Sequence, residues 1–138
     1  MRYDLELAWQ LCHEVGLAAR RDSDDTIDVD LGHGTILLFQ NAIRDDDCLM
    51  GLDGSPWHVH GDIIFADPRG YHVEMDYLNV LTGLAEGLVL VCERQVDGRA
   101  VELSLIHRDY NDEFKYLETN EQIVVRRAVA HAPEVNRD

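Results

Sequence analysis

The sequence predicts an α+β fold: a mainly antiparallel sheet built from hairpins, with an N-terminal helix and a short middle helix packed on one face. Three observations predict this class. An amphipathic stretch opens the chain, a second helical stretch lies near its middle, and alternating segments joined by tight turns fill most of the rest. Strands joined by hairpins form antiparallel sheets. Because 138 residues can bury one core and no long linker divides them, residues 1–138 are expected to form a single domain.

The first expected element is a helix over residues 3–20, because apolar residues from Leu5 to Ala19 recur at helical spacing. Residues 20–25 are charged and polar, and they predict a solvated loop. The next segment, TIDVDLGHGTILLFQ, predicts a strand, a Gly-His-Gly turn and a second strand. Its aspartates alternate with apolar residues, so one face of the first strand is expected to meet water.

A polar turn, RDDD at 44–47, and a short strand, CLMGLD, come next. Residues 57–76 then predict two strands joined by the turn DPRG at 67–70. Proline suits the second position of a type I turn, and glycine suits the left-handed residue that follows it. In the register that this turn sets, Asp62 faces Asp76, and the histidines of WHVHGD lie on the same side as Asp62.

The second helix is expected over DYLNVLTGLAEG, with Gly87 as its C-terminal stop. A second hairpin turns at Asp97-Gly98, which is a strong signal for a two-residue turn. Its first arm is apolar on both faces and is expected to be a central strand. A polar loop at 108–113, strands within FKYLE and QIVVRRAVA, and a frayed tail at 130–138 complete the chain.

The strongest global signal is charge. Twenty-seven acidic residues oppose 12 basic ones, for a formal net charge of -15. This balance disfavours binding to nucleic acid or to an anionic membrane, and it favours a basic protein partner. Compositional bias of a GC-rich genome, or adaptation to salt, would explain the same excess without a partner. The acidic residues expected to contact a partner lie in predicted loops: Asp22, Asp24, Asp25, Asp45, Asp46, Asp47, Asp109, Asp112 and Glu113.

A metal site is the alternative hypothesis. His58 and His60 are one residue apart on a predicted strand, with Asp62 and Asp76 expected beside them. Neutral imidazole nitrogens bind Zn²⁺, Ni²⁺ or Fe²⁺. The competing interpretation is a solvated strand face whose histidines hydrogen-bond to acids. An isolated His-x-His motif is weakly specific, so no cofactor is expected, although a transition metal is compatible with the pattern.

The sequence therefore favours a small acidic binding protein over an enzyme. Bacterial immunity proteins that inhibit nuclease toxins have a similar size and charge, and this is an analogy of physical profile. A metal-dependent enzyme and a structural or oligomeric protein remain the alternatives. Three widely spaced cysteines without a CxxC pair indicate reduced thiols and a cytoplasmic location. No apolar run approaches the ~20 residues that span a bilayer.

Overall fold

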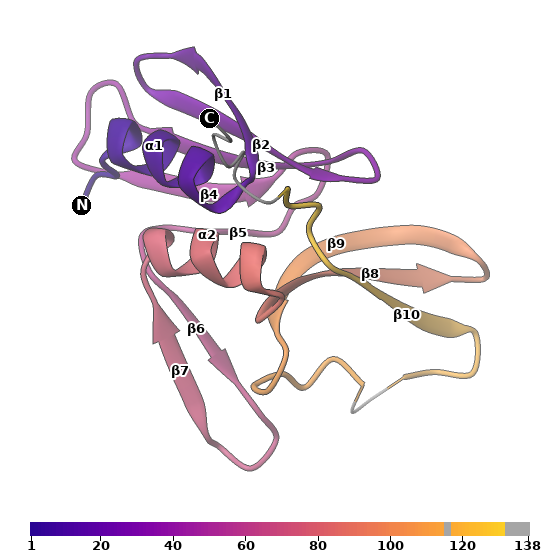
Figure 1. Cartoon of the computed structure of the whole chain (residues 1–138). Coiled ribbons are helices and arrows are strands. Elements are labelled where there is room, and N and C mark those ends of the chain that lie inside the picture. Colours follow the sequence, from indigo (N-terminus) through magenta and orange to yellow (C-terminus); the bar gives the residue numbers. More distant parts are fainter. Residues whose placement is uncertain (115–116, 132–138) are drawn as a thin grey trace, which may run out of the picture.

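The computed structural model describes residues 1–114 and 117–131, and within them it has two helices and ten strands (Figure 1). The helices are α1 (Leu5–Val15) and α2 (Tyr77–Glu86). The strands are β1 (Ala18–Ser23), β2 (Thr26–Gly32), β3 (Thr35–Asn41), β4 (Cys48–Leu52), β5 (His58–Val59), β6 (Ile63–Ala66), β7 (His72–Met75), β8 (Val89–Val96), β9 (Arg99–His107) and β10 (Glu121–Arg126).

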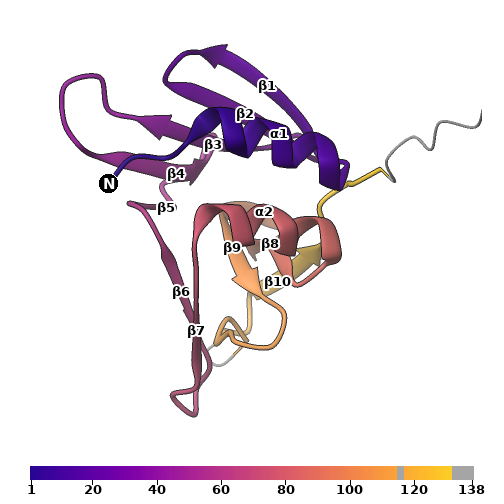
Figure 2. The same cartoon turned by 60° about the vertical axis from the view of Figure 1, so that its left-hand side comes forward.

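The α+β class with an N-terminal and a middle helix is confirmed. All described strand pairs are antiparallel, and they form three sheets with the orders β1-β2-β3-β4-β5, β10-β8-β9 and β6-β7. Helix α1 packs on β1 and β2, and α2 packs on α1, β7 and β8, so the helices meet between the two larger sheets (Figures 1 and 2). One buried cluster joins these parts, including Leu5, Val29, Phe39, Phe65 and Leu84.

The prediction of a helix over 3–20 is wrong in its extent. Asp4 caps the N-terminus of α1 by accepting a hydrogen bond from the backbone of Leu7, and the helix ends at Gly16, which has a φ of 84°. This left-handed conformation favours glycine. The chain then enters β1, so most of the predicted loop at 20–25 is strand and only residues 24–25 form a turn.

The predicted hairpin turns at 67–70 and 97–98 are confirmed. In the first, Gly70 has a φ of 93°, and the ladder pairs Phe65 with Val73 as expected. In the second, Asp97 and Gly98 have φ values of 52° and 78°, as a type I′ turn requires. The arm predicted to be central, β8, lies between β9 and β10.

The expected continuous strand from residue 57 to the first of these turns is wrong. It divides into β5, which belongs to the five-stranded sheet, and β6, which belongs to the two-stranded sheet. Gly61, with a φ of 86°, separates them. The buried Tyr3 hydroxyl donates to the Gly61 carbonyl at 3.0 Å and accepts from its N–H at 3.2 Å, so a contact with the N-terminal segment fixes this bend.

Helix α2 begins after Asp76, which caps it, and ends at Gly87 as predicted. Near the C-terminus, β10 accounts for the start of the predicted strand QIVVRRAVA. Of the strand predicted within FKYLE, residues 115–116 lie outside the described residues and the other three are not in a strand.

Residues 127–131, here called the C-terminal strap, return from β10 to the five-stranded sheet. The N–H of Val129 donates to the carbonyl of Leu31, and the N–H of His131 donates to the carbonyl of Gly16. Residues 130 and 131 of the predicted frayed tail therefore lie beside α1 and the sheet, and the rest of that tail, 132–138, lies outside the described residues. None of the described helices has the length and apolar character needed to cross a membrane.

Candidate functional site

The outer face of the five-stranded sheet carries a row of aspartates. In β2, Ile27, Val29 and Leu31 are buried against α1, so Asp28 and Asp30 point to the opposite side. The ladders place Arg20 and Leu38 on either side of Asp28, in the neighbouring strands. Charged and apolar side chains therefore alternate across this face.

A groove with a volume of about 880 Å³ lies on this face. Its acidic lining consists of Asp22, Asp28, Asp30 and Asp53. Its apolar lining consists of Leu17, Ala18, Ala19, Ile36 and Leu38. His13 from α1 and His131 from the C-terminal strap also contribute to the lining. The groove thus combines an apolar surface with a concentration of carboxylates.

Arg20 is the one basic side chain of the described lining that is always charged. Its Nε lies 2.8 Å from Asp22 Oδ1, and its terminal nitrogen lies 3.2 Å from Asp28 Oδ2. The Arg20 side chain is 76% exposed, so these ion pairs are weak and screened by solvent. Four carboxylates and one guanidinium leave the groove with a negative charge.

Asp28 is the least satisfied carboxylate of the groove. Its side chain is 17% exposed, and its Oδ1 is buried without a hydrogen-bond partner among the described residues. Burial, together with the neighbouring Asp22 carboxylate, raises the pKa of Asp28, although Arg20 opposes the shift. A buried oxygen without a donor is costly. Because Oδ1 itself is buried, a cationic ligand that donates a hydrogen bond to it would be favoured once the Asp28 side chain turns toward the groove.

The residues of the predicted metal site do not gather as a set of four. Asp76 caps α2, and Asp62 lies before β6, outside its ladder with β7. Within residues 1–114 and 117–131, no three His, Cys, Asp or Glu side chains form a group that could hold a metal ion. His58 and His60 do lie together, with ring centroids 5.2 Å apart.

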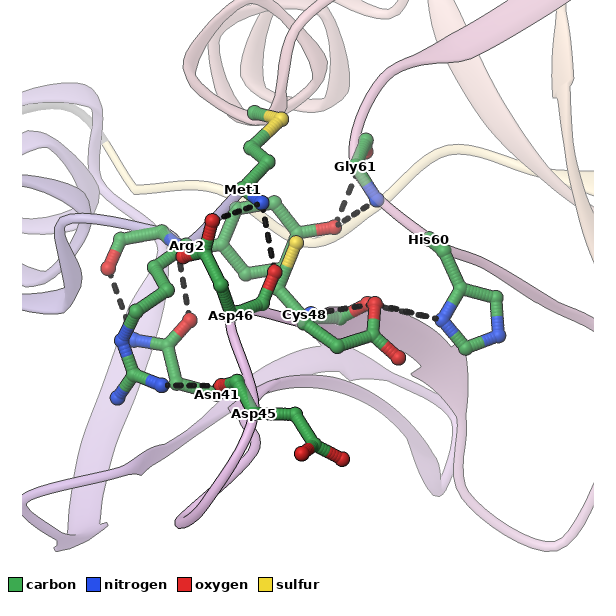
Figure 3. A network of polar contacts seen from close by, with 10 residues as sticks. Met1, Arg2, Asn41, Asp45, Asp46, Cys48, His60 and Gly61 are labelled. Carbon is green, nitrogen blue, oxygen red and sulfur yellow. Dashed lines mark hydrogen bonds and ion pairs between the residues drawn. The ribbon is translucent and has the colours of Figure 1, made fainter.

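Three of the predicted partner residues, Asp45 to Asp47, belong to a loop that the N-terminal segment holds (Figure 3). The Met1 amino group contacts the Asp46 carboxylate at 3.1 Å, and Arg2 donates to the Asp45 carbonyl at 3.1 Å. The Asp47 carboxylate accepts from the N–H of Cys48 and lies 3.3 Å from His60 Nδ1. These contacts, chiefly the one with Cys48, lower the pKa of Asp47.

The other predicted partner residues are distributed over the molecule. Asp22 lines the groove, and Asp24 and Asp25 form the turn between β1 and β2. Asp109 pairs with Arg108 after β9, and Asp112 and Glu113 line a separate cleft of about 220 Å³ beside β6. The loop before β4 and the loop after β9 lie at opposite ends of the molecule (Figure 1). The nine residues therefore do not form one surface.

Sequence reasoning missed most of the groove. The sequence predicts that Asp28 and Asp30 face water and that Asp22 contacts a partner. It predicts no functional role for Asp53 or Arg20, which also line the groove. One signal was present in TILLFQ, where Ile36 and Leu38 place apolar side chains on the solvent face of β3. An apolar outer face beside alternating aspartates predicts a lined surface rather than a fully solvated one.

Comparisons of the chain with models of protein families, with curated protein sequences and with solved structures found no match. The function is therefore inferred from the chain's own residues.

Proposed function

We propose that this chain is a binding protein that recognises a basic segment of another protein in the groove on the outer face of β1–β3. The observation that supports this most is the Asp28 carboxylate, which is largely buried, has one oxygen without a donor in the part of the chain that the structure describes, and lies in a negatively charged groove. Burying a carboxylate in this state costs stability unless a ligand compensates. Exposed aspartates in loops incur little such cost.

The groove suits an arginine or lysine side chain of the partner. Such side chains lay an aliphatic stem on apolar surface and keep a charged head in a polar environment. Ile36 and Leu38 offer the apolar surface, and Asp28 and Asp30 lie beside them in the ladder. Arginine fits better than lysine, because its planar fork of donors can bond a carboxylate through two N–H groups.

The charge of the whole chain supports the same partner class. A formal net charge of -15 attracts a basic protein over long range and speeds their encounter. This profile matches an inhibitor or immunity-type protein that covers a basic surface. Cys12, Cys48 and Cys92 are all free and buried, as suits a protein of a reducing cytoplasm.

The test is an NMR titration of the labelled protein with a tetra-arginine peptide and with the matching tetra-citrulline peptide, which keeps the shape but lacks the charge. The expected result is a shift of backbone amides in β1, β2 and β3 with the arginine peptide alone. The Asp28→Asn, Asp30→Asn variant should bind at least about tenfold more weakly, because even one lost charge-assisted hydrogen bond contributes about 1.5–3 kcal/mol.

Asp97→Asn is the matched control for that variant. It removes one negative charge, against two in the groove variant, and it lies in the turn between β8 and β9, where asparagine accepts the same positive φ. Its affinity for the peptide should stay within about twofold of the original. Shifts confined to the loops at residues 43–47 or 108–113 would place the interface there, and equal shifts with both peptides would argue against charge recognition.

A further inference from the structure

The structure constrains the hydrogen positions of two neighbouring histidines. His58 Nδ1 lies 2.9 Å from the carbonyl oxygen of Pro56, and His60 Nδ1 lies 3.0 Å from the carbonyl oxygen of Cys48. A carbonyl oxygen only accepts hydrogen bonds, so each Nδ1 must carry the hydrogen. In the neutral rings, both Nε2 atoms therefore present free lone pairs, which is the form that binds metal.

The hydrogen bonds at Nδ1 are those expected behind a metal-binding imidazole. A histidine that ligates a metal donates its other ring N–H to a backbone carbonyl or to a carboxylate, and this bond fixes the ring and strengthens the ligand. Both rings have the carbonyl contact, and His60 Nδ1 also lies 3.3 Å from an oxygen of Asp47. Each ring is thus held in the tautomer that leaves Nε2 available to a metal ion.

The separation of the rings also fits. Their centroids are 5.2 Å apart, and both residues are exposed on the edge strand β5 or directly after it. A tetrahedral ion with metal–nitrogen distances of about 2.0–2.1 Å would hold two imidazole centroids roughly 5.3 Å apart. An ion can therefore reach both rings from solvent without opening the core.

We infer that His58 and His60 form a two-histidine chelating site for a divalent transition metal ion such as Cu²⁺, Ni²⁺ or Zn²⁺, with water completing the coordination. The described residues supply no third ligand, so the site is open to solvent. Among these three ions, Cu²⁺ should bind most tightly, following the general order of stability for nitrogen ligands. This site is independent of the groove, because its residues belong to β5 and the bend after it.

The test is a titration of the intact protein with Cu²⁺, read by calorimetry and by electron paramagnetic resonance. The expected stoichiometry is one ion per chain, with the spectrum of two coordinated imidazole nitrogens. His58→Gln and His60→Gln should each weaken binding by about tenfold or more, because the second ligand no longer binds intramolecularly. Each variant spectrum should show a single imidazole nitrogen. Acidification should also weaken binding, because protons compete for the same lone pairs.

His72→Gln is the matched control, because His72 is exposed on β7 and outside the site. Glutamine keeps a donor for the carbonyl contacts, and thermal unfolding of each variant would confirm that it still folds. Binding that is unchanged in His58→Gln and His60→Gln, or that is lost in His72→Gln, would overturn the assignment. One ion per two chains, with formation of a dimer, would overturn the water-completed site, because a second copy would then supply the missing ligands.

Discussion

Two acidic regions of this molecule differ in how their carboxylates are satisfied. In the loop before β4, Asp46 and Asp47 are exposed and contact an amino group, a backbone N–H and a histidine. In the groove, Asp28 is largely buried, and one of its oxygens lacks a donor among the described residues. The loop has the higher density of aspartates in the sequence, but the groove has the carboxylate with a buried oxygen that lacks a donor among the described residues. Under the proposed function, the binding site is thus marked by a buried carboxylate without a donor among the described residues, and not by the highest local density of charge.

The largest expected effect comes from breaking the wall of the groove. A Cβ atom at Gly16 would lie 1.6 Å from the carbonyl oxygen of His131 in the C-terminal strap, at a φ of 84°. Gly16→Ala should therefore lower the free energy of unfolding by about 2–4 kcal/mol, because backbone strain adds to the overlap. Urea denaturation would measure this loss. The control is Gly70→Ala, where φ is 93° and no described atom lies within 4 Å, so that only about 1 kcal/mol is expected. Equal losses would show that the strap does not pack as described.

The next effect concerns the N-terminal segment, which contacts both the loop before β4 and the bend at Gly61. Tyr3→Phe removes the hydroxyl that bonds both the carbonyl and the N–H of Gly61. Leaving these buried groups unpaired should cost about 2 kcal/mol. Tyr71→Phe, at an exposed position in the first hairpin, should change stability by no more than about 0.5 kcal/mol. Native-state hydrogen exchange would locate the loss. Faster exchange in β5 and β6 is expected, whereas a uniform change would argue against a local role for Tyr3.

A comparison of two variants that each lose three carboxylates tests whether the groove or the loop before β4 binds the peptide. One variant replaces Asp45, Asp46 and Asp47 with asparagine, and a second replaces Asp22, Asp28 and Asp30 in the same way, so both remove three negative charges. The groove variant should bind the tetra-arginine peptide about tenfold more weakly or worse, because it loses direct contacts. The loop variant should lose no more than about threefold, because only screened long-range attraction is removed. Surface plasmon resonance would measure both, and equal losses would mean that net charge alone drives binding.

The smallest effect is a pH dependence of stability. Burial raises the pKa of Asp28 above its ordinary value of 3.8, so the folded state holds this proton more tightly than the unfolded state does. The contribution of Asp28 to the free energy of unfolding should therefore fall as the pH rises from 3.8 through the raised pKa. Asp28→Asn removes this loss, so the variant should gain stability relative to the original protein as the pH rises from 3.8 through the raised pKa.

Asp67→Asn provides a control with the opposite sign. Hydrogen bonds from Arg69, together with those from nearby backbone N–H groups, lower the pKa of Asp67. Its stabilisation is therefore present above the ordinary value of 3.8 and is lost as the pH falls through the lowered pKa. The Asp67→Asn variant should lose stability relative to the original protein as the pH rises. If both variants drift in the same direction, the charge state of Asp28 does not control the difference.

The sequence predicted the elements that local chemistry determines. The turns at 67–70 and 97–98 follow from residues that accept positive φ, and the central position of β8 follows from its two apolar faces. The wrong predictions concern segments whose conformation depends on contacts with distant parts of the chain. Helical spacing continues past Gly16 into β1, so the strand that forms one wall of the groove looked like the end of a helix. The bend at Gly61 depends on a tyrosine hydroxyl near the start of the chain.

The candidate sites divide in the same way. The pairing of His58 with His60 follows from adjacent positions in the sequence, but the carbonyl contacts that orient the rings come from Pro56 and Cys48. The groove could not be predicted, because it requires β1, β2 and β3 to lie side by side and α1 to cover their other face. The burial of Asp28 is a property of that assembly, and the residue itself carries no local signal of it.

The C-terminal strap has a consequence for how the protein is made. Its backbone donates hydrogen bonds to Gly16 and Leu31, which are synthesised long before it. The five-stranded sheet and α1 therefore cannot complete their hydrogen bonding until the strap has left the ribosome. Contacts between such distant parts of a chain slow folding, because a long loop must close before they form. The groove, to which His131 contributes, is thus expected to be complete only after the strap has left the ribosome.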